Sequence, residues 1–149
     1  MGLMEIRNGL PGDVPALQRI FRDASLSNEG DRALFAEHPE LLEWADTPLR
    51  EGRTRVATDN GRLVGFHSLL VTNGVVELED LFVDPGDMGR GVGRALTDDA
   101  AAQAREQGFR ALEVDANPHA KAFYAKAGFE DLGVIPVAFG TGFRMRRVL

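Results

Sequence analysis

The sequence contains no cysteine and only three histidines in 149 residues. Without thiols the chain has no disulfide, no thiolate metal site and no cysteine nucleophile, which suits a reducing compartment such as the cytoplasm. His67 and His119 have no second histidine or acid at a ligand-like spacing, so we expect no metal site.

Long apolar runs are also missing, because no stretch approaches the ~18 residues that cross a membrane. The first residues contain no basic-then-apolar leader, so we expect a cytoplasmic protein without a membrane partner. Lys and Arg number 17 against 23 Asp and Glu, a formal net charge of −6. This balance argues against nucleic acid as a partner and mildly favours a cationic acceptor. The length predicts a single domain, residues 1–149.

Two Asn-Gly turns separate three strand-like runs in the middle of the chain. The runs are residues 54–58, 63–72 and 75–83. Such turns between β-rich runs predict two hairpins, and hence three consecutive antiparallel strands. In the third run the apolar alternation slips after Leu78, which predicts a β-bulge near Glu79 and Asp80.

A glycine-rich turn ends the third run and leads directly into a helix. The alternating glycines are Gly89, Gly91 and Gly93, and helical apolar spacing begins at Val92. Glycine lets backbone N–H groups approach a phosphate closely, and the first turn of a helix adds donors and a positive dipole end. We interpret residues 86–94 as a pyrophosphate cradle.

Three phosphate ligands compete for this cradle. A nucleotide-triphosphate loop ends in Gly-Lys-Ser/Thr, and the sequence Gly93-Arg94-Ala95 does not. A dinucleotide fingerprint needs G-x-G-x-x-G directly after the strand. Glu113 imitates the ribose-binding acid of that fingerprint, but the preceding hairpins argue against a parallel dinucleotide sheet. A coenzyme A site fits best.

The run from Val83 to Leu96 resembles motif A of the GNAT superfamily of N-acetyltransferases, whose core is Q/R-x-x-G-x-G/A. The core here is Met88-Gly-Arg-Gly-Val-Gly93. Met88 replaces the usual Gln or Arg, which weakens one side-chain contact and leaves the backbone cradle in place.

Asn117 to Phe129 matches motif B of the same superfamily, N-x-x-A-x-x-F/Y-Y-x-x-x-G-F, at every defining position. Asn117 and Pro118 are typical of a helix start, and Gly128 of a helix end. The strand at residues 111–115 follows a helix, so a βαβ crossover should pair it in parallel with the strand before the cradle. The resemblance covers roughly residues 53–130.

The resemblance implies an α/β (α+β) fold with a mixed, mostly antiparallel sheet flanked by helices and one parallel, splayed strand pair. It also implies an acetyl-CoA-dependent N-acetyltransferase acting by direct transfer in a ternary complex. The acceptor would be a small-molecule or peptide amine, and a homodimer is left open. The alternative is a non-catalytic acyl-CoA-binding or sensor module.

The resemblance also implies which residues bind coenzyme A. They belong to the end of the strand, the cradle and motif B. They are Leu81, Phe82, Val83, Met88, Gly89, Arg90, Gly91, Val92, Gly93, Arg94, Asn117, Ala120, Phe123 and Tyr124.

Acyl transfer needs an acceptor amine that has lost its proton. A lysine-like amine with a pKa of about 10.4 is only about 0.1% neutral at pH 7. A carboxylate near the thioester is the usual remedy, and our candidates are Glu79 first, Glu77 second and Asp80 third. Tyr124, the only tyrosine in the chain, falls at the tyrosine of motif B and is our candidate proton donor to the departing thiolate.

Two further groups of residues have alternative interpretations. The resemblance places Phe35, His38 and Trp44 near the acceptor pocket, and they either touch the substrate or are packing and surface residues. The chain is expected to close with a hairpin, residues 132–137 and 143–149. We interpret its arginines as solvated edge residues, and the alternative is that they form a ligand site. These arginines are Arg144, Arg146 and Arg147.

Overall fold

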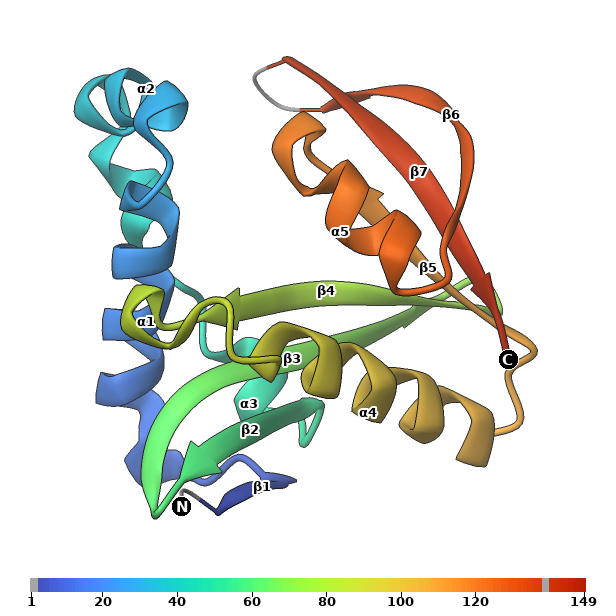
Figure 1. The fold of residues 1–149 in the computed structure, drawn as a ribbon, viewed down its shortest axis with the longest axis horizontal. Helices are drawn as coiled ribbons and strands as arrows, with labels where there is room; N and C mark the ends of the chain where they lie inside the picture. Colours follow the sequence, from blue (N-terminus) through green and yellow to red (C-terminus); the bar gives the residue numbers. More distant parts are fainter. Residues whose placement is uncertain (1–2, 138–139) are drawn as a thin grey trace. The chain divides into compact units, whose positions relative to one another are not determined.

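The computed structural model describes residues 3–137 and 140–149. In this part of the chain, the strands form a seven-stranded sheet in the order β1-β2-β3-β4-β5-β7-β6 (Figure 1). The strands are β1 Met4–Asn8, β2 Thr54–Asp59, β3 Arg62–Thr72, β4 Val75–Val83, β5 Ala111–Ala116, β6 Glu130–Val137 and β7 Gly140–Val148. The α-helices are α1 Val14–Leu26, α2 Arg32–Glu37, α3 Thr47–Arg50, α4 Val92–Glu106 and α5 Lys121–Lys126.

The pairing confirms the mixed, mostly antiparallel sheet. Strand β1 pairs antiparallel with β2, β2 with β3, β5 with β7, and β6 with β7. Strand β4 pairs in parallel with β5, with Glu77 opposite Glu113. Helix α4 lies between these two strands in the sequence, so the predicted βαβ crossover is confirmed.

The chain divides into two compact units, which we describe separately. The first contains the chain up to Ser68 together with Asp80–Leu96, and the second contains Leu69–Glu79 and Thr97–Leu149. Strand β4 passes from the second unit into the first between Glu79 and Asp80, where the apolar alternation slips. The expectation of a single domain stays a prediction.

Both Asn-Gly turns have the backbone that the hairpin prediction requires. Asn60 and Gly61 have φ of 51° and 82°, and Asn73 and Gly74 have φ of 52° and 76°. Positive φ at both central residues is the signature of the type I′ turn, whose twist matches that of the flanking strands. Strand β2 also shifts register between Ala57 and Thr58, a bulge that we did not foresee, while the bulge expected in β4 stays a prediction.

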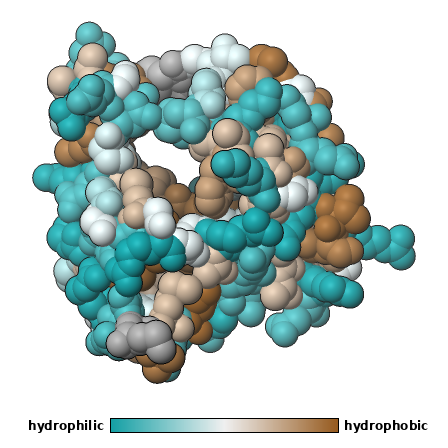
Figure 2. All heavy atoms as spheres, viewed as in Figure 1, coloured by the Kyte–Doolittle hydropathy of each residue, from teal (hydrophilic) through white to brown (hydrophobic). Residues whose placement is uncertain are grey.

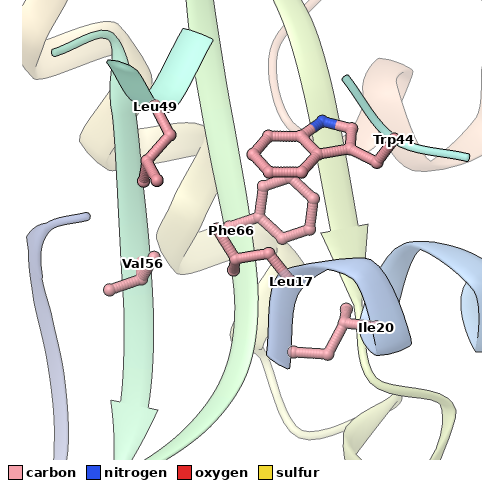
Figure 3. Close-up of a cluster of buried hydrophobic side chains, with 6 residues drawn as sticks. All are labelled: Leu17, Ile20, Trp44, Leu49, Val56 and Phe66. Atoms are coloured by element: carbon pink, nitrogen blue, oxygen red, sulfur yellow. The ribbon is translucent and has the colours of Figure 1, made fainter. Parts of the chain in front are cut away.

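The core of the first unit has two clusters that meet alternate residues of β4. Phe82 packs with the cluster that contains Leu17 and Ile20 of α1, whereas Leu81 and Val83 pack with the cluster that contains α4 residues. Figure 3 shows the first cluster, which is Leu17, Ile20, Trp44, Leu49, Val56 and Phe66. The end of β4 is therefore covered by apolar side chains on both faces, which explains its continuous apolar sequence.

Strand β3 and the end of β4 approach each other closely at Gly65. A β-carbon at Gly65 would lie 2.8 Å from the carbonyl oxygen of Phe82 and 2.9 Å from Cδ1 of Leu96. Only glycine fits at this position without moving backbone. Gly65 thus sets how closely the strand that carries the candidate site can pack.

In the second unit, α5 lies beside the β6–β7 hairpin (Figure 1). The ammonium of Lys121 lies 4.1 Å from the centre of the Phe143 ring on β7 and 2.9 Å from Asp131 Oδ2 on β6. Gly108 and Gly128 end α4 and α5 with φ of 90° and 93°, as expected for left-handed helix stops. The predicted closing hairpin is confirmed, because β6 and β7 pair antiparallel from Glu130 opposite Arg146 to Val137 opposite Gly140.

Hydrophilic residues cover most of the face that Figure 2 presents, with smaller hydrophobic patches between them. Val134 on β6 and Val148 on β7 are 67% and 72% exposed. Among the helices of the described residues, none combines the length and apolar composition needed to cross a bilayer.

Candidate active site

The glycine loop of the first unit has the backbone that the sequence predicts. After β4, Asp84 Oδ1 accepts a hydrogen bond from the Gly86 N–H at 3.2 Å, which starts a tight turn. Gly89 and Gly91 follow with φ of 79° and 83°. The Ala95 N–H donates to the Gly91 carbonyl at 3.0 Å as helix α4 begins. The loop therefore leads without a break into a 15-residue helix.

The space in front of this loop is open. A β-carbon built on Gly89 or Gly91 would have no heavy atom within 4 Å, and both residues are exposed. The Met88 side chain is 51% exposed. An accessible glycine backbone in front of a helix start is the arrangement that binds phosphate through N–H groups. These residues fit a pyrophosphate.

A buried carboxylate within the same loop was missed by the sequence analysis. Asp87 is 2% exposed, and Arg62 of β3 donates to both of its oxygens, at 3.1 and 3.0 Å. The hydrogen bonds from Arg62 hold the pKa of Asp87 below its ordinary value. An arginine 25 residues away in the sequence gave no local signal of this contact.

Arg90, which we expected to bind the cofactor, uses its guanidinium within the protein. Its Nη1 donates to Asp87 Oδ1 at 2.6 Å and its Nη2 donates to Asp59 Oδ2 at 2.8 Å. The other oxygen of Asp59, Oδ1, is buried and has no hydrogen-bond partner among the described residues. Because the Arg90 side chain is engaged within the protein, the group that we expect to bind the cofactor is the Arg90 backbone N–H.

Trp44 is a packing residue with a polar link to β4. Its ring is 6% exposed and lies 5.1 Å from that of Phe66, and Figure 3 shows the two rings together. The indole Nε1 donates to Asp80 Oδ2 at 3.1 Å. Gln18 accepts from the Trp44 N–H at 3.1 Å and donates to its carbonyl. Asp80, the third candidate base, is therefore engaged by the tryptophan.

Phe35 and His38 lie near each other in the sequence but on different elements. Phe35 is half-buried on α2. His38 follows this helix, and its Nδ1 lies 3.2 Å from Glu40 Oε1. Their contact with an acceptor stays a prediction.

In the second unit, Arg144 of β7 binds three carboxylates. Its Nη1 donates to Glu77 Oε2 at 2.8 Å and to Asp115 Oδ1 at 2.7 Å. Its Nε donates to Glu113 Oε1 at 2.9 Å. Burial by itself would lower the pKa of Arg144, but the hydrogen bonds to the three carboxylates raise it above its ordinary value.

The interpretation of Arg144 as a solvated edge residue is wrong. Strand β7 lies between β5 and β6 in the sheet, and the Arg144 side chain is only 24% exposed. Arg147 also forms an ion pair, with Asp98 Oδ1 at 2.7 Å. The edge strand at this end of the sheet is β6, so Arg146, which is 45% exposed and lies 3.8 Å from Glu113 Oε2, is not an edge residue either.

The two leading candidate bases differ in their surroundings. Glu77 is half-buried and held by Arg144, whereas Glu79 is exposed. The structure therefore places Glu79 as the more accessible of the two carboxylates.

Tyr124 on α5 is buried, with 7% of its surface exposed. Its ring makes edge contacts with Phe123 and Phe129, with centroids 5.2 and 5.3 Å apart. Burial raises the pKa of Tyr124, so the phenol keeps its proton through neutral and mildly alkaline pH. Its role as proton donor to the thiolate stays a prediction.

Asn117 has the predicted capping role. Its Oδ1 accepts a hydrogen bond from the Ala120 N–H at 3.0 Å, at the start of a short 3₁₀ turn before α5. Ala120 lies in this 3₁₀ turn, and Phe123 lies in α5. Contact of these residues with coenzyme A stays a prediction.

Each unit contains some of the predicted site residues. The cradle and Leu81, Phe82 and Val83 belong to the first unit, with Gly93 and Arg94 in the first turn of α4. Asp80 also belongs to the first unit, whereas Glu77, Glu79, Tyr124 and the motif B residues belong to the second. Across residues 3–137 and 140–149, no three side chains of His, Cys, Asp or Glu are grouped to hold a metal ion.

Comparison with known proteins identifies the class. The sequence model of the acetyltransferase (GNAT) family matches residues 15–129. That match covers well over half of the chain, so the protein belongs to this family. The resemblance of its two motifs is therefore confirmed.

Curated relatives carry acetyltransferase names. A mycothiol acetyltransferase from Mycobacterium avium is 35% identical over 123 residues, which cover 64% of this chain and 39% of the relative. A glucosamine 6-phosphate N-acetyltransferase from Trypanosoma brucei brucei is 37% identical over 100 residues, covering 60% of this chain and 68% of that protein. The chain spans about two fifths of the mycothiol acetyltransferase.

Solved structures share the whole fold. A GCN5-related N-acetyltransferase from Rhodopseudomonas palustris superposes with a TM-score of 0.80 at 27% identity, covering 100% of this chain and 98% of that one. The PaiA N-acetyltransferase from Thermoplasma acidophilum, solved in complex with coenzyme A, gives a TM-score of 0.76 at 18% identity and covers 99% of both chains. The second likeness establishes the fold alone.

Proposed function

We propose that the protein is an acetyl-CoA-dependent N-acetyltransferase that acts on an amine. The observation that carries the proposal is the glycine loop, in which two exposed glycines with positive φ lead into a long helix. The chain belongs to a family whose cofactor is acetyl-CoA. When bound, acetyl-CoA supplies an acetyl group activated as a thioester.

Each part of the site has a proposed role in holding the cofactor. The N–H groups of residues 88–93 bind the pyrophosphate, helped by the positive end of α4. The backbone of Leu81, Phe82 and Val83 binds the pantetheine arm. Asn117 and the neighbouring α5 residues also contact the cofactor, as the motif B resemblance implies.

The proton transfers are assigned to side chains of the second unit. Glu79 takes the proton from the acceptor amine, directly or through water, because Glu79 is exposed whereas Glu77 is half-buried. The Tyr124 hydroxyl donates a proton or hydrogen bond to the departing thiolate, and burial keeps that hydroxyl protonated.

We propose that transfer is direct, within a ternary complex of protein, cofactor and acceptor. The sequence contains no cysteine that could carry the acetyl group between the two substrates. The amine belongs to a small molecule or a peptide, and a cationic amine suits the formal net charge of −6.

The proposal is tested by incubating the protein with acetyl-CoA and pools of small amines and peptides, and measuring release of free thiol. We expect thiol release that depends on one class of amine, with the mass of one acetyl group added to that amine. A matched reaction without amine gives the background hydrolysis. Tight coenzyme A binding without turnover on any amine would contradict the proposal and favour an acyl-CoA sensor.

A further inference from the structure

A buried acid inside an anion-binding loop needs an explanation. A carboxylate repels a phosphate at close range, yet Asp87 lies within the loop assigned to the pyrophosphate. Its charge is offset because Arg62 and Arg90 both donate to it. Asp87 is therefore a connector between two cations, and its charge does not face a ligand as a bare anion.

The contacts of Asp87 restrain the most flexible part of the loop. Arg90 stands between Gly89 and Gly91, which have the positive φ values of the cradle. Glycine has the greatest backbone freedom of any residue, so ordering such a segment is costly. The two terminal nitrogens of the Arg90 guanidinium are held by different carboxylates, Nη1 by Asp87 and Nη2 by Asp59 of β2. Two ion pairs thus hold Arg90 in place between Gly89 and Gly91.

The beginning of the loop is anchored in the same way. Arg19 of α1 lies 3.0 Å from Asp84 Oδ2, and the other Asp84 oxygen caps the turn. Asp87 attaches the next part of the loop to β3 through its ion pair with Arg62. Ion pairs thus tie the loop to a helix and two strands of its own unit.

We propose that Asp87 is a positioning residue for cofactor binding: it holds the loop in its cradle shape before coenzyme A arrives. This inference rests on the proposed function of the loop. A loop that is already ordered loses less conformational entropy when it binds, so its affinity is higher. Asp87 raises affinity without touching the cofactor.

The test compares two matched variants with the wild-type protein. Asp87→Asn removes the charge and keeps the shape. Asp13→Asn is the control, because Arg7 donates to both Asp13 oxygens at 2.8 and 3.1 Å, and Asp13 is also buried in the first unit. Calorimetry measures the Kd for coenzyme A, thermal unfolding measures stability, and amide hydrogen exchange measures the order of residues 89–91.

We expect both variants to lose similar stability, and only Asp87→Asn to weaken coenzyme A binding, by about tenfold, or ~1.4 kcal/mol. Exchange of the amides of residues 89–91 should become faster in Asp87→Asn alone. Arg62→Gln, an exposed partner of Asp87, should weaken binding about threefold in the same direction. If Asp87→Asn does not fold, the affinity of Arg62→Gln for coenzyme A tests the inference in its place.

Three outcomes would overturn the inference while leaving the proposed function of the loop intact. An affinity for coenzyme A within twofold of wild type in Asp87→Asn would do so, as would an unchanged affinity in Arg62→Gln. An equal loss in Asp13→Asn would show that general destabilisation is the cause. Wild-type protein that does not bind coenzyme A would instead refute the proposed function of the loop, and the inference with it.

Discussion

Replacing Gly91 by alanine tests the cradle with the smallest change available. Gly91 has φ of 83°, and a β-carbon there would meet no protein atom within 4 Å. The substitution therefore strains the backbone without a clash in the protein. An L-residue in the left-handed region costs about 1–2 kcal/mol, which lowers Tm by roughly 3–6 °C in a domain of this size.

The effect on binding should be larger than the effect on stability. The new methyl group would enter the space assigned to the pyrophosphate and force it away from the N–H groups. Loss of one hydrogen bond to a charged group costs about 1.5–3 kcal/mol. We therefore expect the Kd for coenzyme A to rise about 10- to 100-fold, measured by calorimetry on a variant shown to be folded by circular dichroism.

Gly108→Ala is the matched control. Gly108 has φ of 90° at the C-terminal end of the same helix, and its β-carbon would also meet no atom within 4 Å. The two variants should lose similar stability, while Gly108→Ala keeps its affinity for coenzyme A. A Gly91→Ala variant whose Kd stays within twofold of wild type would refute the cradle.

Two further predictions concern the proton transfers. Glu79→Gln should lower kcat/KM about 100-fold or more, most severely at low pH where the acceptor is protonated, whereas a loss seen with Glu77→Gln alone would assign the base to the other carboxylate. Tyr124→Phe should lower kcat about 10²- to 10⁴-fold with coenzyme A affinity unchanged, and turnover within threefold of wild type across the neutral range would show a packing role. Because burial raises the pKa of Tyr124, its contribution to stability is present below the unfolded value of about 10 and lost as pH rises above it. Between neutral and strongly alkaline pH, the free energy of unfolding should therefore fall less in Tyr124→Phe than in the wild-type protein.

The parts of the fold that sequence analysis predicted are those encoded by adjacent residues. Positive φ at Asn60 and Asn73 follows from the Asn-Gly dipeptides, since few other residues adopt that conformation. The helix end at Gly108 has the same local origin. Such features do not depend on how distant segments pack, so the local sequence alone predicts them.

The ion pairs were not predictable because they join residues that are far apart in the sequence. Arg144 meets Glu77 across 67 positions, and this contact requires β7 to lie next to β5 and β5 next to β4. No pattern in the sequence gave the order β5-β7-β6. The buried Asp87 was hidden for the same reason, because a lone acid in a glycine loop looks like a solvated turn residue until Arg62 is placed beside it.

Trp44 is the only tryptophan in the sequence, and this gives the protein a built-in optical reporter. Its indole is buried against Phe66 and hydrogen-bonded to Asp80 on β4. All tryptophan fluorescence therefore originates from one site beside the strand that precedes the glycine loop. A shift in emission wavelength or lifetime during cofactor titration would report a change at that position of β4, without any added label.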